Sequence, residues 1–413
     1  MARGARQSRN AACEGEQSPP LAGIRVVDLG NYIAGPGTAM ILAELGADVI
    51  KVESLTGDIA RNVGPFGQAM IRSYNRDKRS VALDLRCPQG IAVVKRLIAW
   101  ADVFIQNLRP GLVEELGIGS EAMRAADSRL IYVSVSGFGV DGPSRERPGL
   151  DIAAQAESGM MSVTGEPDRP PQRVGFPIVD AATTHVAAHA VLAALFKRER
   201  TGYGDAIQTS LLEVAPHLQA PAWSEYAATG KEPTRQGSGQ ATAAPAAELI
   251  QTRDGWIVLS AYTQDHWARL CKTIEHPDLI DDPRFATNSA RVLNKGALLV
   301  ELTAALGSLS TEECVALLTR NQIVTAAVRS YSQVRKSADV EASCMFVQTR
   351  GEDSFEALRL PYQLSHNGKA TGGIPSVGQH TASILRELGF AEQEVAAMLD
   401  AGVALAPAKA GPP

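Results

Sequence analysis

Short runs of β-branched residues alternate with helical stretches along the first half of the chain. Ile24–Leu29 reads as a strand, Thr38–Leu45 as a helix and Asp48–Glu53 as a second strand, which together make one βαβ unit. Parallel strands need crossover connections of this kind. The alternation therefore predicts an α/β fold with a mostly parallel, doubly wound sheet.

The same rhythm continues along the chain. It predicts strands at Ser80–Leu83, Val103–Gln106, Ile131–Val135 and Ile207–Thr209, and helices at Gly90–Trp100, Ser120–Ala126, Asp151–Met160, Ala181–Arg198 and Leu211–Thr229. The segment Lys231–Ala247 is rich in Gly, Ala, Gln, Thr and Pro, as linkers are. Beyond it, a strand at Gly255–Ser260 and helices at Asp265–Ile274, Lys295–Leu306 and Thr311–Arg320 predict a compact α+β insert. Two further helices, His380–Leu388 and Glu392–Ala401, are predicted near the end.

The charge balance excludes several classes of partner. Forty Lys and Arg stand against forty-five Asp and Glu, a net charge of −5, so no global positive field favours nucleic acid or an anionic membrane. No apolar run is long enough to read as a membrane span. The five cysteines are scattered without metal-ligand spacing, and residues 1–20 lack the apolar core of a secretory signal. We therefore expect a cytoplasmic protein with a flexible tail at 1–20.

The loop after the first strand, Gly30–Gly37, lies where open α/β sheets bind ligands, at the carboxyl end of a strand. It lacks the GxGxxG spacing of a dinucleotide site. Two basic segments, Asn75–Arg79 and Asn107–Gly111, also flank strands. Their guanidinium groups suit a phosphate-bearing ligand, although a solvated surface would have the same composition.

Asp180 follows the extended run Arg173–Val179 and precedes a helix. An aspartate in this place is first of all an N-cap. The same place would also hold a carboxylate ionised near helix amides and aimed as a nucleophile. Asp151 has the same ambiguity. His185 and His189 have i, i+4 spacing but no third ligand accompanies them, so we expect no metal.

A set of ordered segments resembles the class III coenzyme A transferases, which include formyl-CoA transferase, carnitine CoA-transferase and the α-methylacyl-CoA racemases. The resemblance extends roughly from Leu21 to Val403. The segments that carry it are Leu21–Asp28, Ala34–Pro36, Leu45–Glu53, Lys78–Asp84, Asn107–Gly111, Ser136–Gly139, Gln155–Gly159, Asp282–Phe285 and Gly378–Thr381.

The resemblance implies an architecture. It implies an interlocked, ring-shaped homodimer, each subunit with a Rossmann-like large domain built from both chain ends and a smaller α+β inserted domain. In this chain the large domain would take residues 21–230 and 336–405, and the small domain with its linkers residues 231–335. Residues 406–413 would be a frayed tail.

The resemblance also implies a site. The family's nucleophilic aspartate falls on Asp180 and its supporting acidic residue on Asp151. A loop suited to cover the site and exclude water comprises Gly237, Ser238, Gly239 and Gln240. The implied CoA contacts are Ile33 and Ala34, then Leu83, Asp84, Leu85 and Arg86, and finally Asn107, Leu108 and Arg109.

Two departures bear on the activity. Formyl-CoA transferase has glutamine where this chain has Ile33, and the racemases have an acid/base histidine where it has Leu150. Leucine cannot move a proton. The sequence therefore predicts an acyl-CoA:carboxylate CoA-transferase with an aspartyl-CoA intermediate and CoA as substrate, not as a permanent cofactor. A 2-methylacyl-CoA racemase and a CoA-binding subunit without turnover are the alternatives.

Overall fold

The computed structural model describes residues 18–239, 246–350, 354–362, 364 and 372–407. The chain divides into two compact units. The first comprises the described parts of Met1–Ser158, Gly175–Ala220 and Cys344–Pro413, and the second those of Gly159–Val174 and Pro221–Ser343. Residues 1–17 of the tail predicted at 1–20, residues 408–413 of the tail predicted at 406–413, and Gln240 lie outside the described residues.

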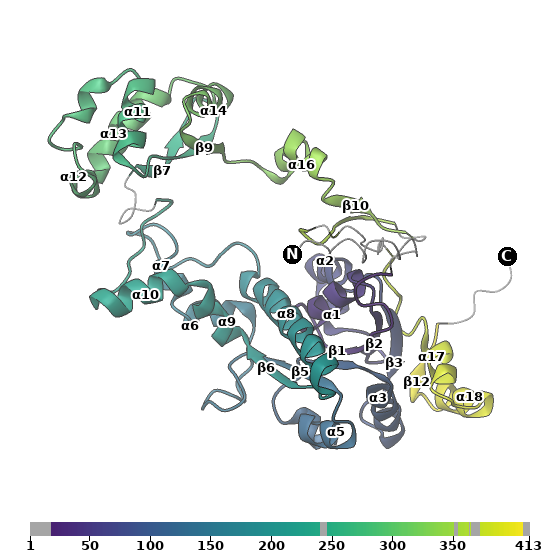
Figure 1. Ribbon diagram of the computed structural model, residues 1–413. Helices are drawn as coiled ribbons and strands as arrows, with labels where there is room; N and C mark the ends of the chain where they lie inside the picture. Colours follow the sequence, from purple (N-terminus) through teal and green to yellow (C-terminus); the bar gives the residue numbers. More distant parts are fainter. Residues whose placement is uncertain (1–17, 240–245, 351–353, 363, 365–371, 408–413) are drawn as a thin grey trace, which may run out of the picture. The chain divides into compact units, whose positions relative to one another are not determined.

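The first unit is built on a seven-stranded sheet of order β12-β3-β2-β1-β4-β5-β6, which Figure 1 shows at its centre. The strands are β1 (Arg25–Leu29), β2 (Asp48–Glu53), β3 (Arg79–Leu83), β4 (Val103–Gln106), β5 (Ile131–Ser136), β6 (Ala206–Ser210) and β12 (Ala404–Leu405). All pairs are parallel except β12 with β3. The predicted α/β fold with a mostly parallel sheet is confirmed.

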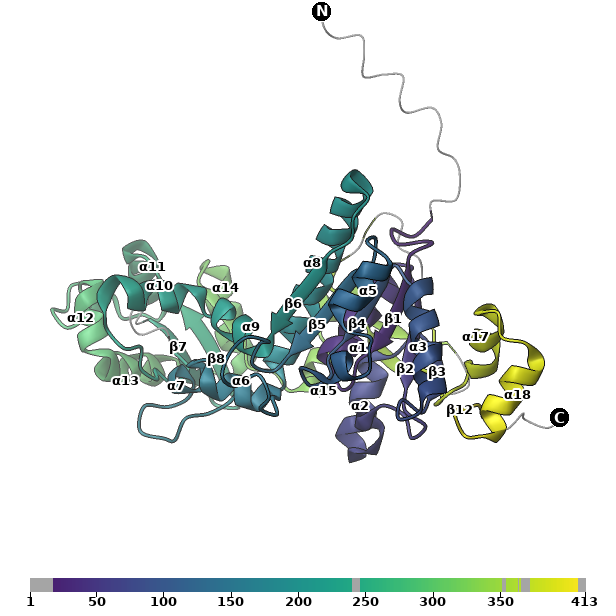
Figure 2. The same cartoon turned by 90° about the horizontal axis from the view of Figure 1, so that it is seen from below.

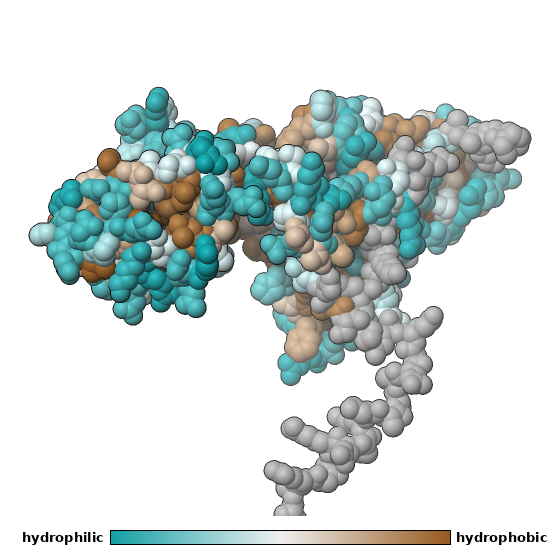
Figure 3. All heavy atoms as spheres, turned by 90° about the horizontal axis from the view of Figure 1, so that it is seen from above, coloured by the Kyte–Doolittle hydropathy of each residue, from teal (hydrophilic) through white to brown (hydrophobic). Residues whose placement is uncertain are grey.

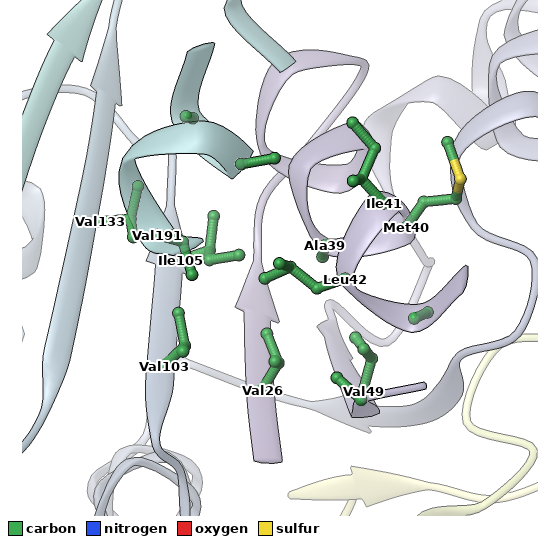
Figure 4. Close-up of a cluster of buried hydrophobic side chains, with 14 of the residues drawn as sticks. Val26, Ala39, Met40, Ile41, Leu42, Val49, Val103, Ile105, Val133 and Val191 are labelled. Carbon is green, nitrogen blue, oxygen red and sulfur yellow. The ribbon is translucent and has the colours of Figure 1, made fainter. Parts of the chain in front are cut away.

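Both faces of this sheet are covered by helices, as its apolar strands require. On one face α1 (Ala34–Glu44) and α8 (Ile178–Thr201) pack over Val26, Val103 and Val133. Figure 4 shows α1 side chains such as Leu42 above the strand residues Val26 and Val49, with Val191 of α8 near Ile105. This close contact between α1 and α8 places the start of α8 beside the first turns of α1.

The opposite face is covered by α3 (Pro88–Trp100), α17 (Thr381–Glu387) and α18 (Glu392–Asp400). Figure 2 shows α17 and α18 beside the β3 and β12 edge of the sheet, so the end of the chain completes a sheet begun by its start. The first unit also contains α4 (Leu112–Glu115), α5 (Ser120–Ala126), α6 (Asp151–Glu157), α9 (Leu211–Leu218), the 3-10 turn η1 (Ile59–Asn62) and α2 (Gly64–Tyr74). A hairpin of β10 (Phe346–Gln348) and β11 (Glu356–Leu358) packs near α2.

Helix α8 is, among the described residues, the one helix long and apolar enough to cross a membrane by length and composition. Core helices of globular proteins pass the same test, and α8 packs against α1 and the sheet. On the face drawn in Figure 3, hydrophilic residues cover most of the described surface, with smaller apolar patches between them.

The second unit has a three-stranded antiparallel sheet of β7 (Ala247–Gln251), β8 (Trp256–Ser260) and β9 (Val324–Ala327). Its core surrounds Trp267 and Phe285. Its helices are α7 (Met160–Val163), α10 (Ala220–Thr229), α11 (Gln264–Thr273), α12 (Asn288–Leu293), α13 (Lys295–Leu306), α14 (Thr311–Arg320), α15 (Tyr331–Arg335) and α16 (Ala338–Ser343), with η2 (Pro277–Ile280). The predicted single helix over Leu211–Thr229 is instead α9 and α10, because α9 ends soon after Pro216.

Candidate functional site

The strand order of the large sheet reverses between β1 and β4, since β2 and β3 lie on one side and β5 and β6 on the other. Open α/β sheets bind ligands at such a reversal, beyond the carboxyl ends of the strands. Here Asn107, just after β4, bridges to the loop after β1: its Oδ1 accepts from the amide of Asn31 at 2.8 Å, and its Nδ2 donates to the Asn31 carbonyl at 2.9 Å. The two strand exits are thus held as one surface.

Buried charges hold the rest of the loop between β1 and α1. The ammonium of Lys51 donates to the Gly30 carbonyl at 2.7 Å, and that of Lys78 to the Pro36 carbonyl at 2.7 Å. Lys78 also pairs with Asp28 at 2.8 Å, and all three of these charged side chains are fully buried. Burial lowers the pKa of Lys78 to about 8. The loop that contains Ile33 therefore has its main chain fixed before any ligand arrives.

The residues predicted to contact CoA lie at this carboxyl edge. Ile33 and Ala34 are buried at the start of α1, Leu83 ends β3, and Leu108 is half-buried after β4. The two arginines are exposed and already paired: Arg86 with Asp84 at 2.8 Å, and Arg109 with Glu115 at 2.9 Å. A phosphate could bind these guanidinium groups only by replacing the carboxylates of Asp84 and Glu115 as their partners. Their roles in CoA binding stay a prediction.

The two predicted catalytic carboxylates meet at the start of α8. Asp151, the first residue of α6, accepts hydrogen bonds through Oδ1 from the amide of Val179 at 2.7 Å and of Asp180 at 3.2 Å. Its Oδ2 accepts from the side chain of Gln155 at 2.5 Å. Asp151 thus satisfies two of the first amides of α8, a task that a capping side chain often performs.

The N-cap interpretation of Asp180 is wrong. Pro177 occupies the N-cap position without a side-chain bond, and Asp180 lies within the first turn of α8. Among the described residues, none donates a side-chain or main-chain hydrogen bond to the Asp180 carboxylate. Burial, with a smaller effect from the negative charge of Asp151, raises the pKa of Asp180 to about 7. The carboxylate is therefore more basic than an ordinary aspartate.

Close packing fixes α8 against α1 at this point. A side chain at Gly37 would place its Cβ 2.7 Å from the Thr184 hydroxyl and 3.0 Å from the ring of Tyr74. Glycine is therefore needed for α1 to approach the first turns of α8. Beside these turns lies a cavity of about 650 Å³, lined among others by Tyr74, Ala181, Thr184 and His185.

The predicted substrate loop belongs to the second unit. Gly237 has a left-handed φ of 66°, and a Cβ there would lie 2.6 Å from the Glu166 carboxylate. A Cβ at Gly239 would collide with Glu248, which pairs with Lys295. Both positions therefore need glycine, while Ser238 lies between them. Gln240 is outside the described residues, and the role of the loop stays a prediction.

The roles of several residues of the first unit were missed in the sequence. Tyr74 lies at the end of α2 and lines the same cavity as Ala181 and Thr184 of α8. Its pKa is raised by burial and by the negative charge of Asp180. Lys78 was predicted within a basic segment suited to a phosphate, but its side chain is fully buried and pairs with Asp28, and Lys51 was noted only as part of a motif. The available signal was the apolar residues beside these lysines in the sequence, which indicate burial. A buried lysine is almost always paired with an acidic group, so a structural role could have been predicted. Within the described ranges no group of three or more His, Cys, Asp or Glu is placed to hold a metal, and His185 and His189 are exposed.

Comparisons with known proteins point in one direction. The sequence profile of CoA-transferase family III matches residues 21–381. A probable fatty acyl-CoA transferase of Mycobacterium tuberculosis is 37% identical over 385 residues, which are 89% of this chain and 97% of that protein. The succinate–glutarate CoA-transferase of Agrobacterium fabrum is 32% identical, over 91% of this chain and 98% of its own length.

Solved structures agree with the fold. A CaiB/BaiF family protein from Brucella suis superposes with a TM-score of 0.82 at 34% identity, covering 90% of this chain and 100% of that chain. An aspartate-to-alanine mutant of the Mycobacterium tuberculosis protein gives a TM-score of 0.80 at 35% identity, covering 89% of this chain and 99% of that chain.

Proposed function

The chain belongs to CoA-transferase family III and is a CoA-transferase, and from this premise we propose that it moves CoA between carboxylic acids through a covalent thioester on Asp180. The observation that supports this most is the pair of carboxylates at the start of α8. Asp151 takes the helix amides, and Asp180 is left basic and without a hydrogen-bond donor among the described residues. A carboxylate in that state is an activated nucleophile.

The proposed reaction has four steps. The Asp180 carboxylate attacks the donor thioester carbonyl, the C–S bond breaks, and a mixed anhydride and CoA thiolate result. The thiolate attacks the aspartyl carbonyl and releases the donor carboxylate, which leaves an aspartyl-CoA thioester. An acceptor carboxylate attacks this thioester to form a second anhydride and thiolate. The thiolate attacks the acceptor acyl carbon, which gives the new acyl-CoA and free Asp180.

CoA would bind across the sheet edge. In this proposal its phosphates bind Arg86 and Arg109, and its thioester end passes the loop at Ile33 and Ala34, supported by Leu83, Asp84, Leu85, Asn107 and Leu108. Leu150 is exposed immediately before α6, which begins with Asp151, and Phe176 is exposed two residues before the start of α8, which carries Asp180. Apolar neighbours of this kind keep water from an energy-rich intermediate. The loop at Gly237, Ser238, Gly239 and Gln240 would complete that exclusion.

The racemase alternative is not favoured. The relatives reported above are named for CoA transfer, and Leu150, 57% exposed before Asp151, has no group that can carry a proton. Incubation of the protein with a 2-methylacyl-CoA in heavy water tests this directly. We expect no deuterium at the α-carbon by mass spectrometry, and rapid exchange would restore the racemase.

The covalent step is tested by intact-mass measurement. The protein is incubated with a panel of acyl-CoA esters, quenched in acid and weighed with and without hydroxylamine. We expect an adduct of the mass of CoA less water, released by hydroxylamine, in the wild type and in Asp205→Asn. Asp180→Asn should carry none and should lose nearly all transfer. Full transfer by Asp180→Asn would refute the assignment.

We also propose the remaining features that the family resemblance implies. The protein is an interlocked homodimer, with a large domain from 21–230 and 336–405 and a small domain at 231–335. It works in the cytoplasm on acyl-CoA and a carboxylic acid, without nucleic acid, membrane or metal. Light scattering after size-exclusion chromatography tests the dimer, since a stable monomer at assay concentration would exclude it.

A further inference from the structure

Tyr32 has an unusual backbone. Its φ is +63°, in the left-handed region. Glycine, asparagine and aspartate adopt this region more readily, and bulky residues such as tyrosine rarely do. Backbone strain of this kind is concentrated at functional sites. Tyr32 stands in the loop between β1 and α1, at the edge of the sheet where ligands bind.

The surrounding structure imposes this conformation. The amide of Tyr32 donates to Oδ1 of Asp58 at 3.2 Å, and Oδ2 of Asp58 pairs with the fully buried ammonium of Lys51 at 2.9 Å. The preceding residue, Asn31, has both main-chain groups bound by Asn107. Two buried charges and a side-chain amide therefore fix the backbone on both sides of the strained residue.

The ring of Tyr32 has a defined place. It packs on a small buried cluster of Ile33, Ala60, Met70 and Ile71, and Tyr74 packs on the same cluster. Tyr74 lines the cavity beside α8, and its pKa is raised by burial and by the negative charge of Asp180. The cluster thus connects the loop that contains Tyr32 and Ile33 to Tyr74, which lines the cavity beside α8.

We propose that Tyr32 is a specificity-determining residue whose strained backbone aims its ring at the acyl group of the thioester. The first carbons of that group rest on the apolar cluster, with Tyr32 limiting their bulk and Tyr74 on the side of Asp180. The acyl class accepted is one with aliphatic carbons next to the thioester. This inference rests on the proposed function, because it places the thioester next to Asp180.

The test uses Tyr32→Gly, which removes the ring and tolerates a left-handed φ, and Tyr32→Asn, a small residue that also adopts it. Steady-state CoA transfer is measured with acetyl-CoA and butanoyl-CoA as donors and one common acceptor. We expect both variants to raise the ratio of kcat/KM for butanoyl-CoA over acetyl-CoA by about tenfold or more, the effect of resizing a hydrophobic pocket. The Kd of free CoA should stay within about twofold of the wild type.

Glu275→Gly is the matched control. Glu275 has a φ of +62° on the exposed surface of the second unit, so this change relieves similar strain away from the cluster. It should leave the ratio unchanged. An unchanged ratio in folded Tyr32 variants, a loss of CoA affinity equal to the loss of activity, or loss of the fold in both variants would each overturn the proposal. Failure of the Asp180 chemistry is seen separately, in the adduct and activity of Asp180→Asn.

Discussion

Asp180→Asn should stabilise the protein above neutral pH while it removes the proposed nucleophile. An aspartate has an ordinary pKa of 3.8, and burial together with Asp151 raises that of Asp180 to about 7 in the folded protein. The folded state therefore holds the proton more tightly than the unfolded state does. The contribution of Asp180 to the free energy of unfolding is therefore fully present at low pH and is lost as the pH rises from about 4 through about 7. Asparagine carries no such charge.

The magnitude follows from the two pKa values. Each pKa unit corresponds to 1.36 kcal/mol, so a rise from 3.8 to about 7 gives at most about 4 kcal/mol. The Asp180 side chain is only partly buried, and solvent screens the charge, so we expect about 1–2 kcal/mol. In a chain of 413 residues that corresponds to a Tm increase of roughly 1–2 °C.

The assay is thermal unfolding of wild type and Asp180→Asn at a common protein concentration and scan rate, from pH 4 to pH 8.5. The Tm difference should be near zero at pH 4, should grow through neutral pH and should level off near pH 8. Asp205→Asn is the control of opposite sign, since its pairing with Lys197 holds the pKa of Asp205 low. A Tm gain that does not depend on pH, or no gain at pH 8, would refute the argument that burial and Asp151 destabilise the Asp180 charge.

Three further predictions use the same site. Because the proposed attacking group must be ionised, kcat/KM should rise with pH and level off above an apparent pKa near 7. Asp151→Asn should lower this apparent pKa, and an unchanged value in the pH–rate profile would contradict the coupling of the two carboxylates. Arg109→Ala should weaken the binding of every acyl-CoA about tenfold or more, as measured by calorimetric titration. Glu115→Gln, which frees Arg109 from its ion pair, should not weaken this binding. Gly37→Ala should destabilise by about 1–3 kcal/mol in denaturant unfolding, because its Cβ would press on Thr184 and Tyr74.

The sheet could be predicted from sequence because its strands and helices differ in hydrophobic period. Strands such as Val103–Gln106 and Ile131–Ser136 are buried on both faces and read as short apolar runs. Helix α2 was missed because Gly64, Pro65 and Gly67 resemble a turn, although proline fits the first turn of a helix. The short strand β9 was missed because its residues, Val324–Ala327, show no clear period.

The candidate site was predictable as a set of residues but not as an arrangement. The family motif singled out Asp151 and Asp180, yet no local pattern tells that Asp151 bonds amides 28 and 29 residues further along the chain. Capping preferences predicted that Asp180 would be the N-cap of α8. Instead, the side chain of Asp151 accepts hydrogen bonds from the first amides of that helix. The strain at Tyr32 is likewise invisible in sequence, because Asp58, Lys51 and Asn107 impose it from three other segments.

The division of tasks between the two aspartates explains why a costly charge can be useful. Asp151 accepts two main-chain amides of α8, whereas none of the described residues donates a hydrogen bond to the Asp180 carboxylate. Asp180 then bears desolvation and repulsion as a free carboxylate. In the proposed reaction, the anhydride and the thioester on Asp180 are both uncharged at that carboxyl. Forming the first anhydride therefore removes the repulsion, which returns only when the last step frees Asp180. The arrangement that destabilises the resting enzyme therefore favours the acylated states, which is the sense in which binding differences accelerate a reaction.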